Sequence, residues 1–200
     1  EIYVQSLFLH LKETQNDCTK FITTRFGNVL GSNGSVVPYF KKLISQGGPI
    51  TVTHPDIIRY FMTIPEASSL VLEAATLGNG GEIFVFDMGQ PVKIADLARN
   101  MIRLAGFVPG KDIEIIYTGL RPGEKLYEEL LNQKELTIPT SNEKILVAKV
   151  REYDYTTVKD RIEQLIATAQ TGKVFPTVQI MKDIVPEFKS KNSPYEQLDK

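Results

Sequence analysis

The chain has 200 residues, of which 42% are hydrophobic, so it can bury one sizeable core and form one globular domain or a large part of one. A formal net charge of -1, with acidic and basic residues interleaved, argues against nucleic acid as the main partner. The one cysteine, Cys18, excludes an internal disulfide and a cysteine-based zinc cage and favours the reducing cell interior.

The first segment, residues 1–13, carries apolar residues at helical spacing and predicts a helix. It lacks the basic, apolar and small-residue order of a signal peptide, and no apolar run in the chain approaches the about 20 residues of a membrane span. We therefore expect no membrane contact by this chain. Because no capping residue precedes the helix, we also expect a fragment that begins inside a helix of a longer protein.

Residues 20–64 alternate between short β-rich runs and one helix. The run 20–26 is apolar and β-branched, as in a buried strand, and leads into a glycine-containing loop. Segment 35–48 has an apolar face at helical spacing, a serine at its start and glycines at its end, which predicts a helix. Runs 49–55 and 57–64, separated by a Pro-Asp turn, predict a small pair of strands.

The middle of the chain continues this alternation. Thr63 and Glu66 have capping-box spacing and begin a predicted helix that ends at Gly78. The next five segments are predicted as strand, helix, strand, helix and strand: 82–88, 93–106, 113–119, 124–131 and 144–150. Strands and helices in turn indicate an α/β fold.

The C-terminal quarter is predicted to be helical. Segment 156–172 is amphipathic, and 177–188 is predicted as a last helix. The polar tail 189–200 is expected to be disordered, because it has few apolar residues to bury.

Three glycines follow the first predicted strand, as they do in dinucleotide-binding loops. A Rossmann fingerprint needs the spacing G-x-G-x-x-G at a strand-to-helix turn, and Gly27, Gly31 and Gly34 do not have that spacing. Their loop nevertheless leads into a helix N-terminus, where free backbone N-H groups and the helix dipole favour an anion such as phosphate. A glycine-rich turn that serves chain geometry alone is the alternative.

Two arginines occupy positions that suit ligand binding. Arg59 lies inside an apolar strand, so its side chain is either paired with a carboxylate or directed into a cleft. Arg121 lies at a predicted strand-to-helix crossing, at the sheet edge where α/β proteins bind ligands. If both side chains face one cleft, they match a diphosphate better than a single carboxylate, because each guanidinium can hold two oxygens.

Catalytic and metal-binding patterns are not found in the sequence. His10 and His54 lie far apart without a partnering Cys or His, so no metal site is predicted. The GSNGS segment differs from the G-x-S-x-G nucleophile elbow, and the acids of 124–131 are typical of a solvated helix face. The residues therefore predict no catalytic acid, base or nucleophile.

Three segments together resemble one known family. Residues 24–68, 80–89 and 119–131 contain the motifs TRFGNVLGSNGS, GGEIFVFDMG and GLRPGEKLYEELL. They resemble the C-terminal part of CapD-like capsular polysaccharide biosynthesis proteins, the nucleotide-sugar 4,6-dehydratases of the extended short-chain dehydrogenase/reductase superfamily. The resemblance spans about residues 1–150 and implies an α/β fold, the substrate-binding C-terminal part of a Rossmann-like extended short-chain dehydrogenase/reductase.

The resemblance also implies how the chain is divided. Residues 1–150 would form the end of the Rossmann-like domain, interleaved with the nucleotide-sugar-binding region. Residues 151–188 would form a C-terminal helical extension, and 189–200 the disordered tail.

Site residues follow from the same resemblance. Phe26 and Gly27 are implied beside the nicotinamide end of the cofactor, and Arg59 and Arg121 at the diphosphate of a UDP-sugar. The full set of implied substrate-binding residues is Asn28, Ser32, Asn33, Gly34, Ser35, Val36, Arg59 and Arg121. No catalytic residue is implied, because the family's glycine-rich NAD(P) loop and signature lysine lie N-terminal to the part represented.

The function implied for the whole protein is NAD(P)-dependent 4,6-dehydration of a UDP-N-acetylhexosamine in capsular or surface polysaccharide biosynthesis. NAD or NADP would be bound mainly by the missing N-terminal part, so the isolated chain is expected to be inactive. A UDP-sugar 4-epimerase and a non-catalytic UDP-sugar-binding module are the alternatives. We expect a homo-oligomer in the cytoplasm, with an inner-membrane anchor in the full-length protein left open.

Overall fold

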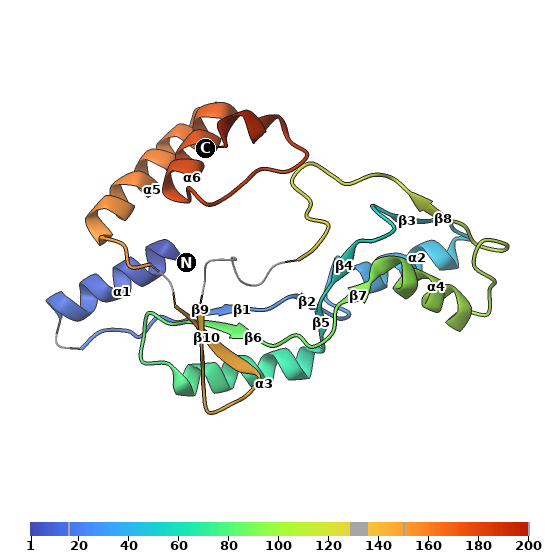
Figure 1. Ribbon diagram of the computed structural model, residues 1–200, viewed down its shortest axis with the longest axis horizontal. Helices are drawn as coiled ribbons and strands as arrows, with labels where there is room; N and C mark the ends of the chain where they lie inside the picture. Colours follow the sequence, from blue (N-terminus) through green and yellow to red (C-terminus); the bar gives the residue numbers. More distant parts are fainter. Residues whose placement is uncertain (16, 129–135, 150, 200) are drawn as a thin grey trace.

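The computed structural model describes residues 1–15, 17–128, 136–149 and 151–199, and contains a four-stranded mixed sheet (Figure 1). The strand order is β1-β6-β10-β9, with β1 parallel to β6 and β10 antiparallel to both its neighbours. These strands are β1 (Thr23–Arg25), β6 (Ile83–Phe86), β10 (Ile145–Lys149) and β9 (Leu136–Pro139). Every residue of β6 is buried, as its central place in the sheet requires.

The helix α3 (Ile64–Leu77) covers one face of this sheet and lies on the chain path between the parallel strands β1 and β6. As predicted, it is capped by Thr63, whose hydroxyl accepts a hydrogen bond from the Glu66 amide at 3.3 Å, and it ends at Gly78. A helix between two parallel strands is the repeating connection of α/β folds, so the predicted fold class is confirmed.

A second group of elements packs beside the sheet around its own hydrophobic cluster, with Phe40, Ile50 and Ile102 among the fully buried members. It contains the predicted helices α2 (Val36–Ser45) and α4 (Ile94–Leu104). Three short ladders accompany them: β2 (Asn28–Val29) with β5 (Phe61–Met62), β3 (Ile50–Val52) with β8 (Ile115–Tyr117), and β4 (Ile58–Arg59) with β7 (Val92–Lys93).

The predicted strand pair 49–55 and 57–64 is wrong. The strands in these runs pair instead with distant partners: β3 with β8, β4 with β7 and β5 with β2. The turn between them is closed locally, since the Asp56 amide donates to His54 Nδ1 at 3.1 Å, but no hairpin follows. Short apolar runs favour burial without specifying a partner, and these strands bury their side chains against distant elements.

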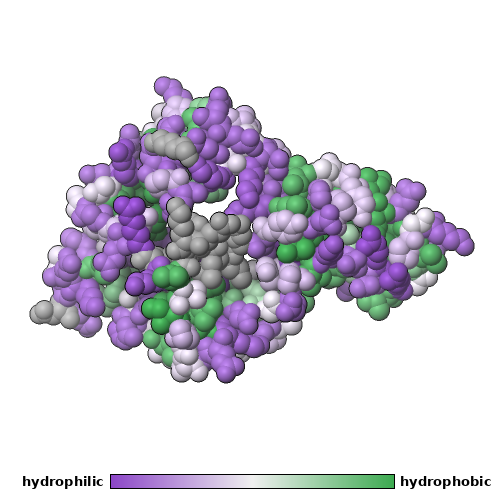
Figure 2. Space-filling view, in the orientation of Figure 1, coloured by the Kyte–Doolittle hydropathy of each residue, from purple (hydrophilic) through white to green (hydrophobic). Residues whose placement is uncertain are grey.

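The C-terminal helices lie on the other side of the sheet from α3 in Figure 1. There α1 (Ile2–Thr14) contacts α5 (Tyr155–Gln170), which packs against α6 (Val174–Ile184). These helices present mostly hydrophilic residues on the face shown in Figure 2, whereas hydrophobic residues reach the surface around α2 and α4. Among the described residues, no helix is long and apolar enough to cross a membrane.

The tail differs from the expected disorder. Residues Pro194–Leu198 form a 3-10 helix, η1, that packs against α6. Ser193 and Glu196 form a capping box at its start, and Asp199 forms an ion pair with Lys182. The polar composition of the tail favoured disorder, but an ion pair to a distant helix cannot be foreseen from composition.

The predicted helix 124–131 is also wrong where the structure describes it. Residues 124–128 form an irregular segment after a turn at Pro122 and Gly123, and 129–131 lie outside the described residues. The Leu126 carbonyl accepts a hydrogen bond from the Ile58 amide at 3.2 Å, and the Leu126 side chain packs against the α2/α4 cluster. These tertiary contacts override the helix propensity of the segment.

The close packing around Gly80 explains why this position is a glycine. No sequence pattern gave a reason for it. Gly80 has φ +109°, and a Cβ placed there would lie 2.1 Å from the ring of Phe8, which is buried. The Phe8 ring therefore holds α1 against the turn that precedes β6.

Replacing Gly80 by alanine is expected to lower the free energy of unfolding by about 1 to 3 kcal/mol, because the added methyl group overpacks the Phe8 contact. Urea denaturation followed by circular dichroism measures the change. Combining G80A with Phe8→Leu should recover part of the loss. A fully stable G80A variant would show that α1 does not pack tightly on this turn.

Candidate functional site

Phe26 and Gly27 lie directly after β1, at the carboxyl end of this parallel strand. The Phe26 ring stacks on the ring of Phe86 with centroids 5.7 Å apart. A Cβ on Gly27 would lie 3.0 Å from the Tyr60 carbonyl oxygen and 3.2 Å from Met88, so a larger residue does not fit without a shift. The two predicted cofactor-binding residues therefore occupy a closely packed corner between β1, β6 and the β4–β5 segment.

Asn28 begins β2, and its side chain is held by a residue that the sequence did not single out. The Asn28 amide donates to the Glu128 carboxylate at 3.2 Å and to the Tyr60 carbonyl at 3.3 Å. The same oxygen of Glu128 accepts from the Tyr60 amide at 3.3 Å. Glu128 therefore fixes both the side chain of Asn28 and the backbone next to Arg59.

The loop between β2 and α2 is a tight turn that leads into the helix. Gly31 and Gly34 both have φ +75°, a conformation that favours glycine, and the Ser32 hydroxyl donates to the Val29 carbonyl at 2.9 Å. Asn33 and Gly34 are exposed. The predicted ligand loop, Ser32 to Val36, thus presents its tip to solvent.

The start of α2 has polar groups available for a ligand. Ser35 is the N-cap residue, yet its side chain makes no capping hydrogen bond. Its Oγ is buried and has no partner among the residues that the structure describes. Val36 is the first helical residue, where backbone N-H groups lack intrahelical acceptors. A buried hydroxyl beside these N-H groups suits an anionic oxygen.

Arg59 lies on β4 and is half-buried. Its Nη1 donates to the Ile58 carbonyl at 2.7 Å, and its Nη2 lies 3.6 Å from Glu124 Oε1. The carboxylate pairing that the sequence left open for this arginine is therefore present. At 3.6 Å the ion pair is long for a charge-assisted hydrogen bond, so Arg59 keeps donors for a further partner.

The backbone of Arg121 contacts the same carboxylate, that of Glu124. The other oxygen of Glu124 accepts from the Arg121 amide at 3.0 Å, and Oε1 also accepts from the Thr53 hydroxyl at 3.1 Å. The Arg121 residue is exposed, and its guanidinium has no hydrogen bond or ion pair with the described part of the chain. One carboxylate thus connects the side chain of Arg59 with the backbone of Arg121.

Glu124 and Glu128 are the residues that sequence reasoning missed. Both were assigned to a solvated helix face, but both are half-buried and accept hydrogen bonds from other elements. The Pro122-Gly123 pair before them indicates a turn but gives no signal against a helix that starts at 124.

Replacing Glu128 by alanine is expected to lower the free energy of unfolding by about 1 to 3 kcal/mol, because the Asn28 side chain and the Tyr60 amide both lose their acceptor. Thermal unfolding measures the effect. The matched control is Glu143→Ala, at an exposed position, which should change stability by less than about 0.5 kcal/mol. Equal stability of both variants would mean that Glu128 does not hold Asn28.

A pocket of about 570 Å³ lies beside this site, between the β2–α2 loop and α3. Phe26 and Ser32, two of the predicted site residues, line it, together with mostly apolar side chains that include Ile64 and Val71. The pocket suits a planar or apolar group rather than a phosphate.

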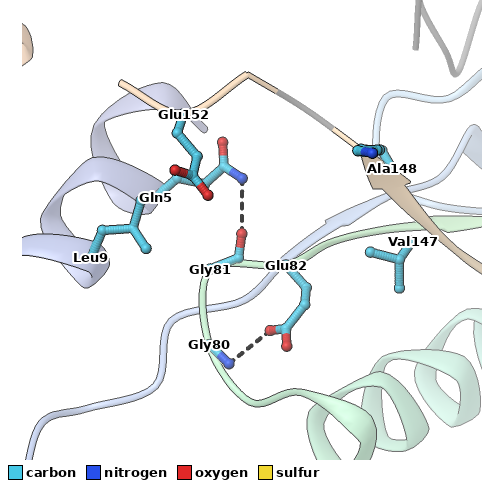
Figure 3. A pocket seen from close by; sticks show the side chains of 9 residues that line it. Gln5, Leu9, Gly80, Gly81, Glu82, Val147, Ala148 and Glu152 are labelled. Atoms are coloured by element: carbon cyan, nitrogen blue, oxygen red, sulfur yellow. Dashed lines mark hydrogen bonds between the residues drawn. The ribbon is translucent and has the colours of Figure 1, made fainter. Parts of the chain in front are cut away.

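A second pocket, of about 260 Å³, is lined by residues of α1, of the turn before β6 and of β10 (Figure 3). It adjoins the start of β6, where the Gln5 side chain donates to the Gly81 carbonyl at 2.8 Å. None of the predicted site residues lines it. Within the described parts of the chain, no group of three or more His, Cys, Asp or Glu side chains could hold a metal ion.

The fold corresponds to a known architecture. The X-ray structure of Pen from Bacillus thuringiensis matches with a TM-score of 0.60 and 34% sequence identity, over 72% of this chain and 43% of that one. The chain is thus an α/β protein with part of a Rossmann-like extended short-chain dehydrogenase/reductase fold, the fold class that the resemblance implied.

A family model described as "Polysaccharide biosynthesis protein" matches residues 2–150. The chain therefore belongs to this family of polysaccharide biosynthesis proteins. It is 56% identical over 166 residues to the capsular polysaccharide biosynthesis protein CapD of Staphylococcus aureus, covering 83% of this chain and 27% of that protein. The chain thus spans about a quarter of the length of this relative.

More distant relatives carry names of specific reactions. The UDP-N-acetylglucosamine 4,6-dehydratase (inverting) of Campylobacter jejuni is 38% identical over 121 residues, 60% of this chain and 34% of that protein. The UDP-glucose 4-epimerase of Rickettsia bellii is 36% identical over 120 residues, again 60% of this chain and 34% of that protein.

Proposed function

We propose that this chain is the substrate-binding part of a UDP-N-acetylhexosamine 4,6-dehydratase. The observation that carries the proposal is the position of Glu124, whose carboxylate contacts both the side chain of Arg59 on β4 and the backbone amide of Arg121. If the exposed guanidinium of Arg121 and that of Arg59 face the same ligand, the two groups match a diphosphate. The name of the Campylobacter jejuni relative supports a UDP-N-acetylhexosamine as the substrate and dehydration as the reaction.

In this proposal the diphosphate is bound by charged and neutral donors. Arg121 contributes an exposed guanidinium, and Arg59 contributes the donors that its contact with Glu124 leaves available. The N-H groups at the start of α2 and the buried Ser35 hydroxyl add neutral donors. Asn28 would face the phosphates, and the full loop of Ser32, Asn33, Gly34, Ser35 and Val36 would line the nucleotide.

The proposed cofactor is NAD or NADP, and the residues present fit one end of it. Phe26 lines the 570 Å³ pocket, and the absence of a side chain at Gly27 allows the close approach of Tyr60 and Met88. Bound NAD(P)+ would supply a hydride acceptor for C4 of the sugar and return the hydride at C6, while water is lost across C5 and C6. The residues of this chain bind and orient the substrate, and we assign none of them a proton transfer.

NAD binding to the isolated chain is expected to be weak or undetectable, because none of its glycines has the G-x-G-x-x-G spacing that holds a pyrophosphate. Fluorescence or calorimetric titration with NAD+ and NADP+ measures this. UDP serves as the positive control in the same preparation. Micromolar NAD+ binding would show that the cofactor site is placed wrongly.

Two alternatives remain within this proposal. The Rickettsia bellii relative supports a UDP-sugar 4-epimerase, and a UDP-sugar-binding module fits a site to which we assign no catalytic residue. Incubating the full-length protein with UDP-N-acetylglucosamine and NAD(P)+ and identifying the product by NMR separates these functions. A 4-keto-6-deoxy sugar indicates the dehydratase, inversion at C4 indicates the epimerase, and unchanged substrate with retained binding indicates the module.

Binding by the chain itself is tested by calorimetry with UDP-N-acetylglucosamine, UDP and uridine. UDP-sugar and UDP should both bind, and uridine should bind far more weakly because it lacks the diphosphate. Equal affinities for UDP and uridine would contradict the proposed role of the arginines. The isolated chain should not turn over UDP-N-acetylglucosamine.

The oligomeric state of the protein and its location in the cell are also proposals. We propose a homo-oligomer, to be tested by light scattering of the full-length protein. We propose a cytoplasmic site of action, consistent with the free thiol of Cys18. Fractionation of cells that express the full-length protein tests whether it carries a membrane anchor. The division into 1–150, 151–188 and 189–200 stays a prediction.

A further inference from the structure

The segment that follows α6 reaches back to the loop that carries Arg121 (Figure 1). The Gly123 amide, two residues after Arg121, donates to the Lys191 carbonyl at 2.8 Å. Gly123 has φ +79° and lies in the turn that the Glu124 amide closes by donating to the Arg121 carbonyl at 3.0 Å. One backbone hydrogen bond thus connects the C-terminal segment with the proposed diphosphate site.

The C-terminal segment is itself held at both ends by Asp199. Both carboxylate oxygens of Asp199 accept from the Ser190 amide at 3.1 Å, and one of them forms an ion pair with Lys182 of α6. Lys182 is only 5% exposed, and its ammonium lies 5.4 Å from the centre of the Phe188 ring. The hydrogen bond from Lys182 lowers the pKa of Asp199, so the carboxylate of Asp199 is charged at neutral pH.

The middle of the segment is rigid for separate reasons. The Tyr195 amide donates to the Ser193 hydroxyl at 3.2 Å, and the Ser193 amide donates to Glu196 at 3.3 Å. The Tyr195 ring packs edge-on against Phe175 of α6 with centroids 5.1 Å apart. Residues 190–199 therefore form a closed loop on α6, and Lys191 is fixed in place within it. We call these ten residues the C-terminal clasp.

The clasp lies outside the residues that the family model matches, which end at 150, but its contact at Gly123 lies inside them. This contact joins the clasp to the turn that bears Arg121, and it can therefore affect ligand binding. Arg121 has no side-chain partner among the described residues, so its direction depends on the turn that bears it. Fixing that turn before the ligand arrives lowers the entropy lost on binding.

We propose that the C-terminal clasp positions Arg121 for the diphosphate of a nucleotide ligand, with Lys182 and Asp199 as the positioning residues. The proposal rests on the proposed function for the identity of the ligand. The placement of the turn by the clasp does not depend on it.

The test uses Lys182→Met and Asp199→Asn in the 200-residue chain, with UDP as the probe. Exchange of the Gly123 amide, followed by NMR, should become about fivefold to tenfold faster, the worth of one hydrogen bond, and the Kd for UDP should rise by a similar factor. The control, Glu66→Gln, makes the same carboxylate-to-amide change in the exposed pair with Lys144 and should alter neither quantity.

A double-mutant cycle separates positioning from a general loss of structure. In the Arg121→Ala background, D199N should cause no further loss of UDP affinity, because the clasp acts through Arg121. An additive loss would overturn the proposal. The proposal would also be overturned if D199N speeds exchange of the Ser190 amide but leaves the exchange rate of the Gly123 amide unchanged.

If the variants do not fold, native-state exchange of the wild-type chain decides the question. The Gly123 and Ser190 amides should then open with the same free energy across a range of low denaturant concentrations, because one event frees both. Independent opening of the two amides would overturn the proposal. Absence of UDP binding to the wild-type chain counts against the proposed function, whereas Gly123 exchange still decides whether the clasp holds the turn.

Discussion

Replacing Arg59 or Arg121 by alanine is expected to cost on the order of 1.5 to 3 kcal/mol of UDP binding, or roughly a 10- to 150-fold rise in Kd. Each substitution removes a charged donor that can hold two phosphate oxygens. Calorimetry with UDP measures the change. Arg121→Lys and Arg59→Lys should fall between wild type and alanine, because lysine keeps the charge but loses the planar fork.

The two arginines should differ in their effect on stability. Arg121→Ala should leave thermal unfolding nearly unchanged, since the Arg121 guanidinium has no partner in the described part of the chain. Arg59→Ala leaves the half-buried Glu124 without its cation and should lower the melting temperature. The control for both is Arg103→Ala, which lies in the last turn of α4 beside Asn100. If neither the Arg59→Ala nor the Arg121→Ala substitution changes the affinity for UDP, the proposed diphosphate site is wrong.

The order of helices and strands was predictable to the extent that it depends on local signals. The α3 cap at Thr63 and the buried run that forms β6 carry such signals, and both predictions are confirmed. Strand pairing depends on contacts between distant segments. The run 49–55 was therefore identified as a strand, although its partner proved to be β8 rather than the neighbouring run.

The charged residues of the candidate site show the same limit of prediction from the sequence. Arg59 was recognised because an arginine in an apolar strand requires a partner. Glu124 and Glu128, which hold Arg59 and Asn28, could not be separated from solvated helix acids until the path of the chain was known. The buried lysine of the clasp, Lys182, likewise has no local sequence signal, because its partner Asp199 is 17 residues away.

Phe40 is expected to be the most costly single position in the group around α2. Its side chain is 1% exposed and packs in the cluster with Ile50 and Ile102. Phe40→Ala should lower the free energy of unfolding by about 3 to 5 kcal/mol, since it removes a buried ring and leaves a cavity. A loss of this size is a large part of the usual stability of a domain. Denaturation in urea measures it.

The neighbouring residue supplies the matched control. Tyr39 lies on the same helix but is 45% exposed, with its hydroxyl 3.1 Å from that of Thr51. Tyr39→Ala should cost no more than about 1 kcal/mol, and Phe40→Leu should fall between the two alanine variants. Because α2 carries Ser35 at its N-terminus, loosening Phe40 should also weaken UDP binding, whereas Tyr39→Ala should not. Equal destabilisation by the two alanine substitutions would show that the cluster does not anchor α2, and with it the loop that we assign to the nucleotide.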